Sequence, residues 1–309
     1  MDPEVEKILR KQGYAIVGKH SAVKLCHWLR ESLLHNRPCY KQTFYGIRTH
    51  RCLQMSPAVN NCTQNCLFCW RFQGFSEVYM KEVDDPEFIV EESIRQQRRL
   101  LTGYKGDPRV DLEKWKEAME PRHVAISLTG EPTLYPRLGE LIEEYHRRGF
   151  TTFLVTNGTM PEVLENLDPL PTQLYVTVAA PNEEIYKKLL VPLIRNGWER
   201  LRRTLELLPS LNTRKVIRHT LVRGWNIGYE EEYAKLDLLA EPDFIEPKAY
   251  VFVGYSRERL TIENMPRHEE IREFAKKMAE ITGYRYEDER EDSRVVLLMN
   301  ENTQRFLSS

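Results

Sequence analysis

Apolar segments that alternate with stretches of helical periodicity are the feature of this sequence that most constrains its fold. Five such segments read as buried strands: residues 123–128, 151–155, 173–178, 215–222 and 244–253. A sixth, residues 49–56, precedes them. Helical patterns lie between the strands at residues 87–101, 137–148, 182–190 and 199–208. Strands that alternate with helices build βαβ units, so the sequence predicts an α/β fold around a parallel sheet.

Polar motifs follow four of the predicted strands. They are Thr129-Gly130-Glu131-Pro132, Thr156-Asn157-Gly158, Ala180-Pro181-Asn182 and Arg223-Gly224. Each motif alone is ordinary turn chemistry. Functional residues of parallel α/β folds gather at the carboxyl ends of the strands, however. Their recurrence therefore predicts one shared active-site rim.

The two ends of the chain have a different pattern from its centre. Helices are expected at residues 4–12 and 22–34, before the first strand. A helix at residues 266–282 and an apolar strand at 294–299 follow the last one. We expect that final strand to pair antiparallel with the sheet.

The charge balance excludes a chain-wide basic surface. Lys and Arg number 45 and Asp and Glu number 46, so the net charge is −1 and any nucleic-acid site must be a local patch. The acidic start, Met1 to Glu4, does not resemble a secretory signal, and no apolar run approaches the ~20 residues that span a bilayer. We expect a cytoplasmic protein without a membrane association.

All six cysteines lie in the first quarter of the 309 residues. They are Cys26, Cys39, Cys52, Cys62, Cys66 and Cys69. A disulfide framework is typical of short secreted domains, which this chain does not resemble, and scattered structural thiols are a further alternative. The clustering favours metal ligands.

The last three cysteines have a compact C-x3-C-x2-C spacing, in Cys62-Thr-Gln-Asn-Cys66-Leu-Phe-Cys69. A zinc site usually needs four ligands, so a zinc interpretation requires a distant histidine. Three thiolates can instead hold three irons of a 4Fe–4S cluster and leave the fourth iron open. An open iron can bind the amino and carboxylate groups of a methionine moiety. The spacing resembles the signature of the radical S-adenosylmethionine (SAM) superfamily.

Further residues fit this superfamily resemblance. Phe68 occupies the aromatic position that lies against the adenine. Gly130-Glu131 resembles the superfamily's GGE motif, with Thr129 in place of one glycine, and the Glu131 carboxylate would accept the SAM ammonium group. Thr156 and Asn157 are candidates to contact the ribose, although an Asn at a turn is also a common left-handed residue.

Cys26, Cys39 and Cys52 have two interpretations. Their thiolates can hold a second 4Fe–4S cluster, whose open iron would act as a Lewis acid toward a small carboxylate or keto acid. Alternatively they are buried structural cysteines. Lys41 lies two residues after Cys39. A desolvated lysine there can form an imine with a carbonyl substrate, although surface lysines are commoner.

Longer segments resemble the 4-demethylwyosine synthase family, in its stand-alone archaeal form. They begin at Cys52-Leu-Gln-Met-Ser-Pro, Cys62, Ser127-Leu-Thr-Gly-Glu-Pro, Phe153-Leu-Val-Thr-Asn-Gly and Tyr250-Val-Phe-Val-Gly-Tyr-Ser. The resemblance implies a partial parallel (β/α)6 barrel of the radical SAM type with N- and C-terminal extensions. We expect a single domain, residues 1–309, divided into an N-terminal extension 1–47, a barrel 48–256 and a C-terminal extension 257–309.

The resemblance also implies a substrate, tRNA(Phe) with 1-methylguanosine beside the anticodon, and pyruvate as carbon donor. A deoxyadenosyl radical would take hydrogen from the N-methyl group, and the methylene radical would add to the pyruvate carbonyl carbon. Cys26, Cys39 and Cys52 would hold an auxiliary 4Fe–4S cluster, and Lys41 would form a Schiff base with pyruvate. An external electron donor, flavodoxin-like or ferredoxin-like, is required.

Two alternatives remain at this point: another two-cluster radical SAM enzyme with a different RNA or peptide substrate, and a non-catalytic iron–sulfur or zinc RNA-binding protein. The second would not explain Gly130-Glu131. A flipped base entering the barrel calls for basic and aromatic residues at its mouth. The candidates are Arg71, Arg214, Lys215, Arg218, Arg223, Arg257, Arg259, Trp70 and Tyr255.

Overall fold

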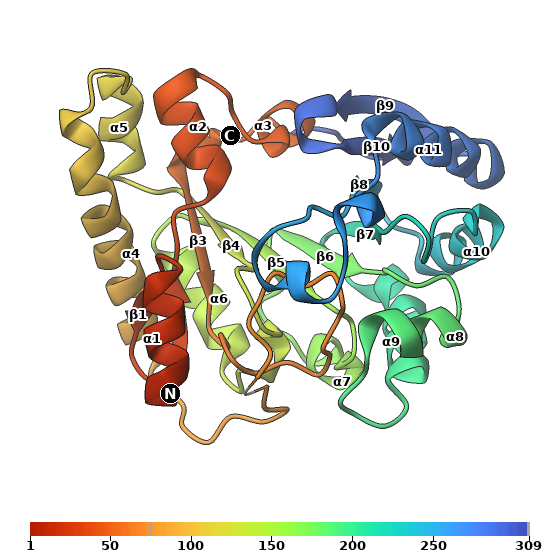
Figure 1. The fold of residues 1–309 in the computed structure, drawn as a ribbon, viewed down its shortest axis with the longest axis horizontal. Helices are drawn as coiled ribbons and strands as arrows, with labels where there is room; N and C mark the ends of the chain where they lie inside the picture. The colour runs from red at the N-terminus through yellow and green to blue at the C-terminus, as the bar shows by residue number, and fades with distance from the viewer. Residues whose placement is uncertain (75, 308–309) are drawn as a thin grey trace.

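Six parallel strands form the centre of a ten-stranded sheet in this computed structural model, which describes residues 1–74 and 76–307 (Figure 1). The parallel strands are β3 (Cys52–Ser56), β4 (His123–Ile126), β5 (Thr151–Thr156), β6 (Gln173–Thr177), β7 (Arg214–Leu221) and β8 (Phe244–Ala249). They pair in chain order from β3 to β8. The predicted partial parallel (β/α)6 barrel is confirmed.

Antiparallel strands extend both edges of this barrel. β1 (Ala15–Val17) and β2 (Ser21–Val23) precede β3, while β10 (Val295–Met299) pairs with β8 and β9 (Arg285–Arg290) pairs with β10. The predicted antiparallel strand 294–299 is confirmed. The predicted helix 22–34 is wrong in its first residues, because Ala22 and Val23 pair with β3 and the helix begins at His27.

Strand β8 is shorter than the predicted segment 244–253. Its neighbour β7 ends at Leu221, whose carbonyl accepts the last bond from the Tyr250 N–H (2.8 Å). Residues 251–253 therefore leave the sheet and lead to the loop at Gly254.

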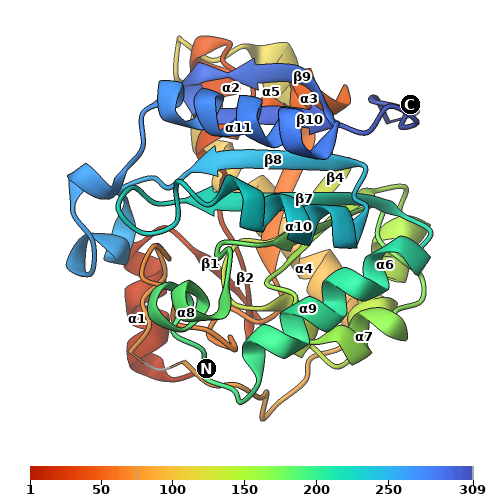
Figure 2. The same cartoon turned by 90° about the vertical axis from the view of Figure 1, so that its right-hand side faces the viewer.

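Most of the helices lie outside the sheet, and Figure 2 shows α9, α10 and α11 side by side in front of the strands. The helices are α1 (Pro3–Lys11), α2 (His27–His35), α3 (Tyr40–Tyr45), α4 (Pro86–Thr102), α5 (Leu112–Ala118), α6 (Leu138–Arg147), α7 (Pro161–Glu165), α8 (Glu183–Ile185), α9 (Gly197–Leu207), α10 (Glu230–Ala240) and α11 (His268–Thr282). The predicted helix 182–190 becomes α8 and a π-helix, Tyr186–Leu190. No helix in the described part of the chain combines the length and apolarity needed to cross a bilayer.

The two faces of the sheet have different chemistry. Residues such as Ile217 and Ile245 belong to the large apolar core under the helices. Side chains alternate across a strand, so their neighbours Arg218 and Glu246 lie on the opposite, inner face. An aromatic cluster that includes Phe44 from α3 packs at the amino ends of the strands on that face. Helix α3 thus closes one end of the inner face, and this face also carries the charged groups of Arg218 and Glu246.

Candidate active site

The loop after β3 brings Cys62, Cys66 and Cys69 together as half-buried thiols. Burial and the neighbouring Cys69 and Cys62 raise the pKa of Cys66 well above its usual value. Burial raises the pKa of Cys62 to about 11, and nearby Arg71 opposes this shift. Thiols that disfavour one another's ionisation become thiolates when a cation binds them. The donor set and its placement fit an iron–sulfur cluster.

This cysteine loop is fixed by a second segment of backbone. The N–H groups of Asn65 and Leu67 donate to the carbonyls of Val191 (3.0 Å) and Leu189 (2.9 Å). In return the Leu193 N–H donates to the Thr63 carbonyl (2.8 Å). The loop is therefore a rigid platform although it is not part of a strand.

Two arginines also hold the loop. Arg259 donates from Nε to the Leu67 carbonyl (3.1 Å) and from Nη2 to the Cys69 carbonyl. Arg71 is only 3% exposed and donates to Ser76 Oγ (2.7 Å) and to the Gln64 carbonyl (3.1 Å). These two residues, expected at an RNA-binding mouth, are engaged by the protein itself.

Glu131 links two strand ends at the rim of the barrel. Its Oε1 accepts hydrogen bonds from Thr156 Oγ1 (2.6 Å) and from Thr133 Oγ1 (2.6 Å) and N (3.1 Å), while Oε2 accepts one from the Asn157 N–H (2.8 Å). The side chain is 1% exposed, and burial raises its pKa. Glu131 therefore already has four protein donors, which position its carboxylate beside the cysteine loop.

Gly130 allows the close approach of the rim to the cysteine loop. Its φ is +72°, and a Cβ at this position would lie 1.8 Å from the Ala58 carbonyl oxygen. The next N–H, of Glu131, donates to the Asn61 carbonyl (2.7 Å). Only glycine fits this contact.

The other predicted SAM contacts lie nearby. The Asn157 side chain donates to Thr63 Oγ1 (2.8 Å) in the cysteine loop, and Thr156 is buried. Phe68 is half-buried and packs against the main core. These residues surround one end of the loop, as a shared rim requires.

Two of the four strand-end motifs have structural partners instead. Asn182 caps α8 through the Ile185 N–H (3.0 Å) and donates to Glu232 (2.7 Å). Arg223 forms an ion pair with Glu270 and donates to the Glu263 carbonyl (2.8 Å). The predicted rim is therefore built from the motifs after β4 and β5.

The other three cysteines meet at the opposite end of β3. Cys26 and Cys39 directly precede α2 and α3, and Cys52 is the first residue of β3. Burial, together with Cys26, raises the pKa of Cys39 to about 11 and that of Cys52 to about 12. In Figure 1, α2 and α3 lie at the top, away from the N-terminal helix α1. The thiol donors again fit a second cluster.

Within the described residues, no three Cys, His, Asp or Glu side chains converge on a point that would hold a single metal ion. A 4Fe–4S cluster places each thiolate on a different iron. Its ligands therefore need to surround a volume and do not need to meet at one point.

Lys41 lies inside the barrel beside the second cysteine set. Its Nζ is 4.4 Å from the Tyr175 ring centroid and 4.7 Å from that of Phe153. Burial lowers its pKa, and the nearby Arg218 adds to this shift. The half-buried position shows that Lys41 is not an ordinary surface lysine.

Sequence reasoning did not find the charged network around Lys41. Glu246 is fully buried and accepts hydrogen bonds from Tyr45 Oη (2.6 Å), Tyr40 Oη (3.0 Å) and Arg218 Nη2 (2.9 Å). Arg218 was expected at the mouth of the barrel and lies in its interior. The alternation of the strand places its side chain on the inner face, and that was the available signal.

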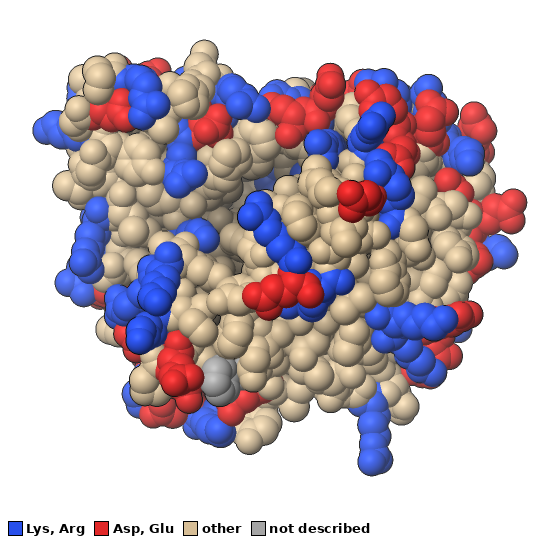
Figure 3. Space-filling view, viewed as in Figure 1, with Lys and Arg blue, Asp and Glu red and all other residues tan. Residues whose placement is uncertain are grey.

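Arg214, another expected RNA contact, stabilises the C-terminal tail. It donates to the carbonyls of Gln304 (2.6 Å) and Arg305 (2.8 Å) and stacks over Phe244. Of the arginines proposed for the mouth, Arg257 is exposed. The face shown in Figure 3 is hollowed near its centre, with basic side chains around the hollow.

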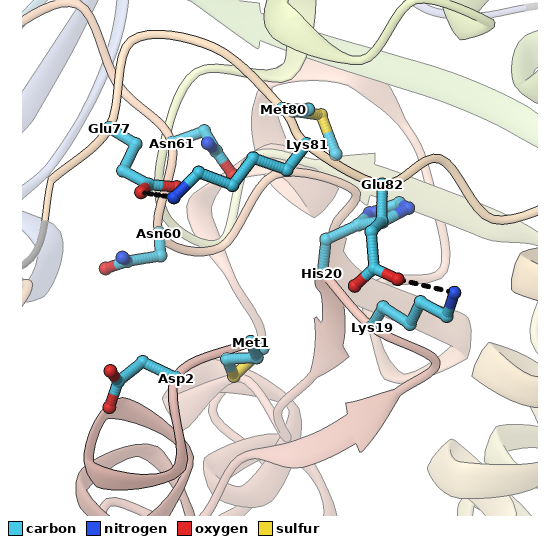
Figure 4. A pocket seen from close by; sticks show the side chains of 10 residues that line it. All are labelled: Met1, Asp2, Lys19, His20, Asn60, Asn61, Glu77, Met80, Lys81 and Glu82. Atoms are coloured by element: carbon cyan, nitrogen blue, oxygen red, sulfur yellow. Dashed lines mark hydrogen bonds and ion pairs between the residues drawn. The ribbon is translucent and has the colours of Figure 1, made fainter.

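A separate pocket of about 310 Å³ lies on the outside of the cysteine loop (Figure 4). Four of its charged residues form two ion pairs, Lys19 with Glu82 (2.7 Å) and Lys81 with Glu77 (2.6 Å). His20 Nδ1 donates to the Pro57 carbonyl (2.6 Å), and its Nε2 accepts from the Asp84 N–H (2.8 Å).

The sequence of this chain is similar to those of known protein families and enzymes. A sequence model of the radical SAM superfamily matches residues 56–236, and one for wyosine base formation matches residues 239–300. The S-adenosyl-L-methionine-dependent tRNA 4-demethylwyosine synthase of Pyrococcus abyssi is 58% identical over 98% of this chain and 90% of its own. The Methanocaldococcus jannaschii enzyme of the same name is 45% identical over 97% and 96%.

The chain belongs to the 4-demethylwyosine synthase family. It is therefore a radical SAM enzyme, which uses SAM and a 4Fe–4S cluster. This membership confirms the expected family and enzyme class, and it favours that interpretation over another two-cluster radical SAM enzyme or a non-catalytic binding protein.

A solved structure in this family matches the whole fold. A structure of TYW1 with a lysine–pyruvate adduct bound is 44% identical, with a TM-score of 0.90, over 99% of this chain and 98% of that one. The partial barrel and both of its antiparallel edges therefore belong to a known architecture.

Proposed function

We propose that this enzyme converts 1-methylguanosine beside the anticodon of tRNA(Phe) to 4-demethylwyosine, with pyruvate as carbon donor. The observation that supports this most is Lys41, which lies in the barrel interior beside Cys39 and Cys52, two of the three thiols of the second set. The names of the relatives and the lysine–pyruvate adduct of the similar structure support the same assignment.

The residues of the rim would bind the cofactors. Cys62, Cys66 and Cys69 would hold the 4Fe–4S cluster. SAM would contact five residues: Phe68, Gly130, Glu131, Thr156 and Asn157. The cluster and SAM together supply a carbon radical when bound. Glu131 fixes the rim through its four donors, and Oε2, which accepts one of these bonds, would retain acceptor capacity for the SAM ammonium group.

Cys26, Cys39 and Cys52 would hold an auxiliary 4Fe–4S cluster at the other end of the barrel. We keep the division of the single domain expected from the sequence: an N-terminal extension 1–47, a barrel 48–256 and a C-terminal extension 257–309. The first segment supplies two of the three auxiliary cysteines and Lys41. Cys52, the third, belongs to the barrel itself.

Lys41 would bind pyruvate covalently. Its neutral amine attacks the keto carbon, a C–N bond forms, and the carbonyl oxygen leaves as water to give an imine. Burial of the amine, with the Arg218 guanidinium nearby, favours the uncharged state that this attack needs. The imine would hold the carbon donor in the barrel until the tRNA base enters.

Electrons would come from a separate flavodoxin-like or ferredoxin-like donor. Because the proposed substrate is a tRNA, we place the reaction in the cytoplasm.

The test is a reaction with reconstituted enzyme, SAM, pyruvate, a reductant and tRNA(Phe) that carries 1-methylguanosine. Nucleoside mass spectrometry should detect 4-demethylwyosine, and the same tRNA with unmodified guanosine should give none. Lys41→Arg retains the charge but cannot form an imine, so it should release 5′-deoxyadenosine without the tricyclic product. Product formation by Lys41→Arg would contradict the role of Lys41.

A further inference from the structure

Basic side chains gather in the interior beside Lys41. Arg218 and Lys248 lie there with the carboxylate of Glu246, and Asp292 also lies near Lys248. Lys248 donates to the Ser293 carbonyl (2.7 Å) and stacks over the Tyr40 ring (4.8 Å). Of these basic groups, the Arg218 guanidinium has the geometry to bind an anionic group.

Arg218 is held rigidly along one edge of its guanidinium group. Nε and Nη2 donate to Glu246 Oε2 (3.1 and 2.9 Å), and Nη2 also donates to Tyr40 Oη (2.7 Å). Glu246 is in turn fixed by Tyr45 Oη (2.6 Å). The network therefore holds the arginine in one orientation before any substrate binds.

The other side of the same guanidinium is free. Nη1 makes none of the hydrogen bonds found among residues 1–74 and 76–307, and the side chain is 17% exposed. Arg218 and Lys41 also contact the same ring, at 4.5 and 4.4 Å from the Tyr175 centroid. An imine-forming amine and a fixed N–H donor thus lie on one aromatic side chain.

From this geometry we infer that Arg218 binds the carboxylate of the keto acid whose carbonyl carbon reacts with Lys41. The inference rests on the proposed function and adds a specificity determinant to it. In an α-keto acid the carboxylate is bonded directly to the carbonyl carbon, so one molecule presents both groups to adjacent partners. Arg218 is a positioning residue: it aligns the carbonyl for attack and takes no part in the loss of water.

The test measures the imine directly, without tRNA or turnover. Reconstituted enzyme is incubated anaerobically with increasing pyruvate and cyanoborohydride, which reduces the imine, and the modified Lys41 peptide is quantified by mass spectrometry. In Arg218→Met, the pyruvate concentration for half-maximal labelling should rise about tenfold or more, because a charge-assisted hydrogen bond is lost. Labelling by propanal, an aldehyde without a carboxylate, should change little. Arg218→Lys should restore part of the difference.

Arg214→Met is the matched control. Arg214 lies on the same strand and stacks over Phe244 (4.9 Å), where it contacts the C-terminal tail. Its labelling curve should equal that of the wild type. Because Arg218→Met removes the ion-pair partner of the buried Glu246, the double variant Arg218→Met/Glu246→Gln provides a second test in which residue 246 is neutral.

The outcomes separate the inference from the function on which it rests. If the wild type, Arg218→Met and Arg218→Met/Glu246→Gln have the same pyruvate dependence, the inference is overturned and the Lys41 imine is unaffected. Equal losses with pyruvate and propanal would show a general disturbance of Lys41 and would overturn it too. No label on wild-type Lys41 would instead refute the imine itself.

Discussion

At the scale of single residues, the rim of the barrel depends on one carboxylate. Glu131 accepts hydrogen bonds from Thr156 and Asn157 at the carboxyl end of β5, and from Thr133 in its own turn. A carboxylate suits this position because both oxygens accept, whereas an amide offers only one acceptor oxygen. Both carboxylate oxygens of Glu131 thus hold the rim together.

We predict that Glu131→Gln weakens SAM binding by about tenfold or more, because at least one buried donor loses its acceptor. Equilibrium dialysis with the reconstituted enzyme measures the affinity. Glu140→Gln, on the exposed surface of α6, should bind SAM like the wild type. Unchanged affinity in Glu131→Gln would contradict the assignment.

Gly130 gives a second prediction at this scale. Gly130→Ala should lower the free energy of unfolding by at least about 3 kcal/mol, from left-handed strain plus the clash with the Ala58 carbonyl. Gly13→Ala has the same strain, at φ +81°, with no atom within 4 Å, and should cost only about 1 kcal/mol. Urea unfolding compares the two. Equal losses would mean that the close contact is not required.

The role of a residue could be predicted from the sequence where its neighbours in the chain form a recognisable motif. Glu131 and the cysteines lie in local motifs whose chemistry is visible without a structure. Arg218 and Glu246 are 28 residues apart and meet only because β7 and β8 pair in register. No short-range pattern marks such a pair, so the network around Lys41 needed the structure.

At the scale of elements, the segment after β8 stabilises the cysteine loop from outside. Arg259 donates to two of its carbonyls, and the Tyr255 N–H donates to the Trp70 carbonyl (3.1 Å). A proposed boundary between barrel and C-terminal extension at residue 257 therefore separates segments that cooperate in one site.

We predict that Arg259→Ala loses iron from the reconstituted enzyme to a chelator about tenfold faster than the wild type, as for other residues that orient metal ligands. Arg257→Ala is the matched control, because Arg257 is exposed and donates only to the Phe252 carbonyl (3.2 Å). Absorbance of the cluster follows the loss. Equal rates in the two variants would show that Arg259 does not support the loop.

Strand β4 gives a prediction for pH. Burial, with Arg51 and His50 nearby, lowers the pKa of His123 to about 4, below the ~6.5 of an unfolded chain. As the pH falls, His123 is protonated in the unfolded state before it is protonated in the folded state. The contribution of neutral His123 to the free energy of unfolding is therefore complete above pH 6.5 and is lost as the pH falls toward 4. Between pH 7.5 and pH 5 the free energy of unfolding should fall by about 2 kcal/mol because of His123.

Urea unfolding at the two pH values checks this prediction for His123. His123→Gln should be less sensitive to pH than the wild type by that amount. His123 donates or accepts one bond with Thr151 Oγ1 (2.7 Å), which glutamine can replace. The same pH dependence in both proteins would contradict the shifted pKa.

Elements with long periodic patterns were predicted well, and short elements were not. The six parallel strands and helices such as α4 and α11 follow their hydrophobic periodicity closely. Strands β1 and β2 have three residues each, and β9 is rich in charge, so none of them has a pattern distinct from a loop. Their pairing with the sheet edges is a tertiary effect.

At the scale of the whole molecule, the barrel has a polar interior between two sets of thiols. One set follows the carboxyl end of β3, and the other meets at its amino end. Lys41 and the Glu246 network lie between the strands that connect these ends. The sequence predicted both sets of ligands, but their placement at opposite ends of one strand came from the fold.

We propose that this chain holds two chemically distinct iron–sulfur sites, one of them beside the reactive Lys41. The most direct measurement is anaerobic iron and sulfide quantification on the wild type and on the triple variant Cys26→Ala/Cys39→Ala/Cys52→Ala. The wild type should hold about eight irons and the variant about four, with SAM cleavage retained and the tricyclic product absent. About four irons in both proteins would contradict the claim and would make the first three cysteines structural.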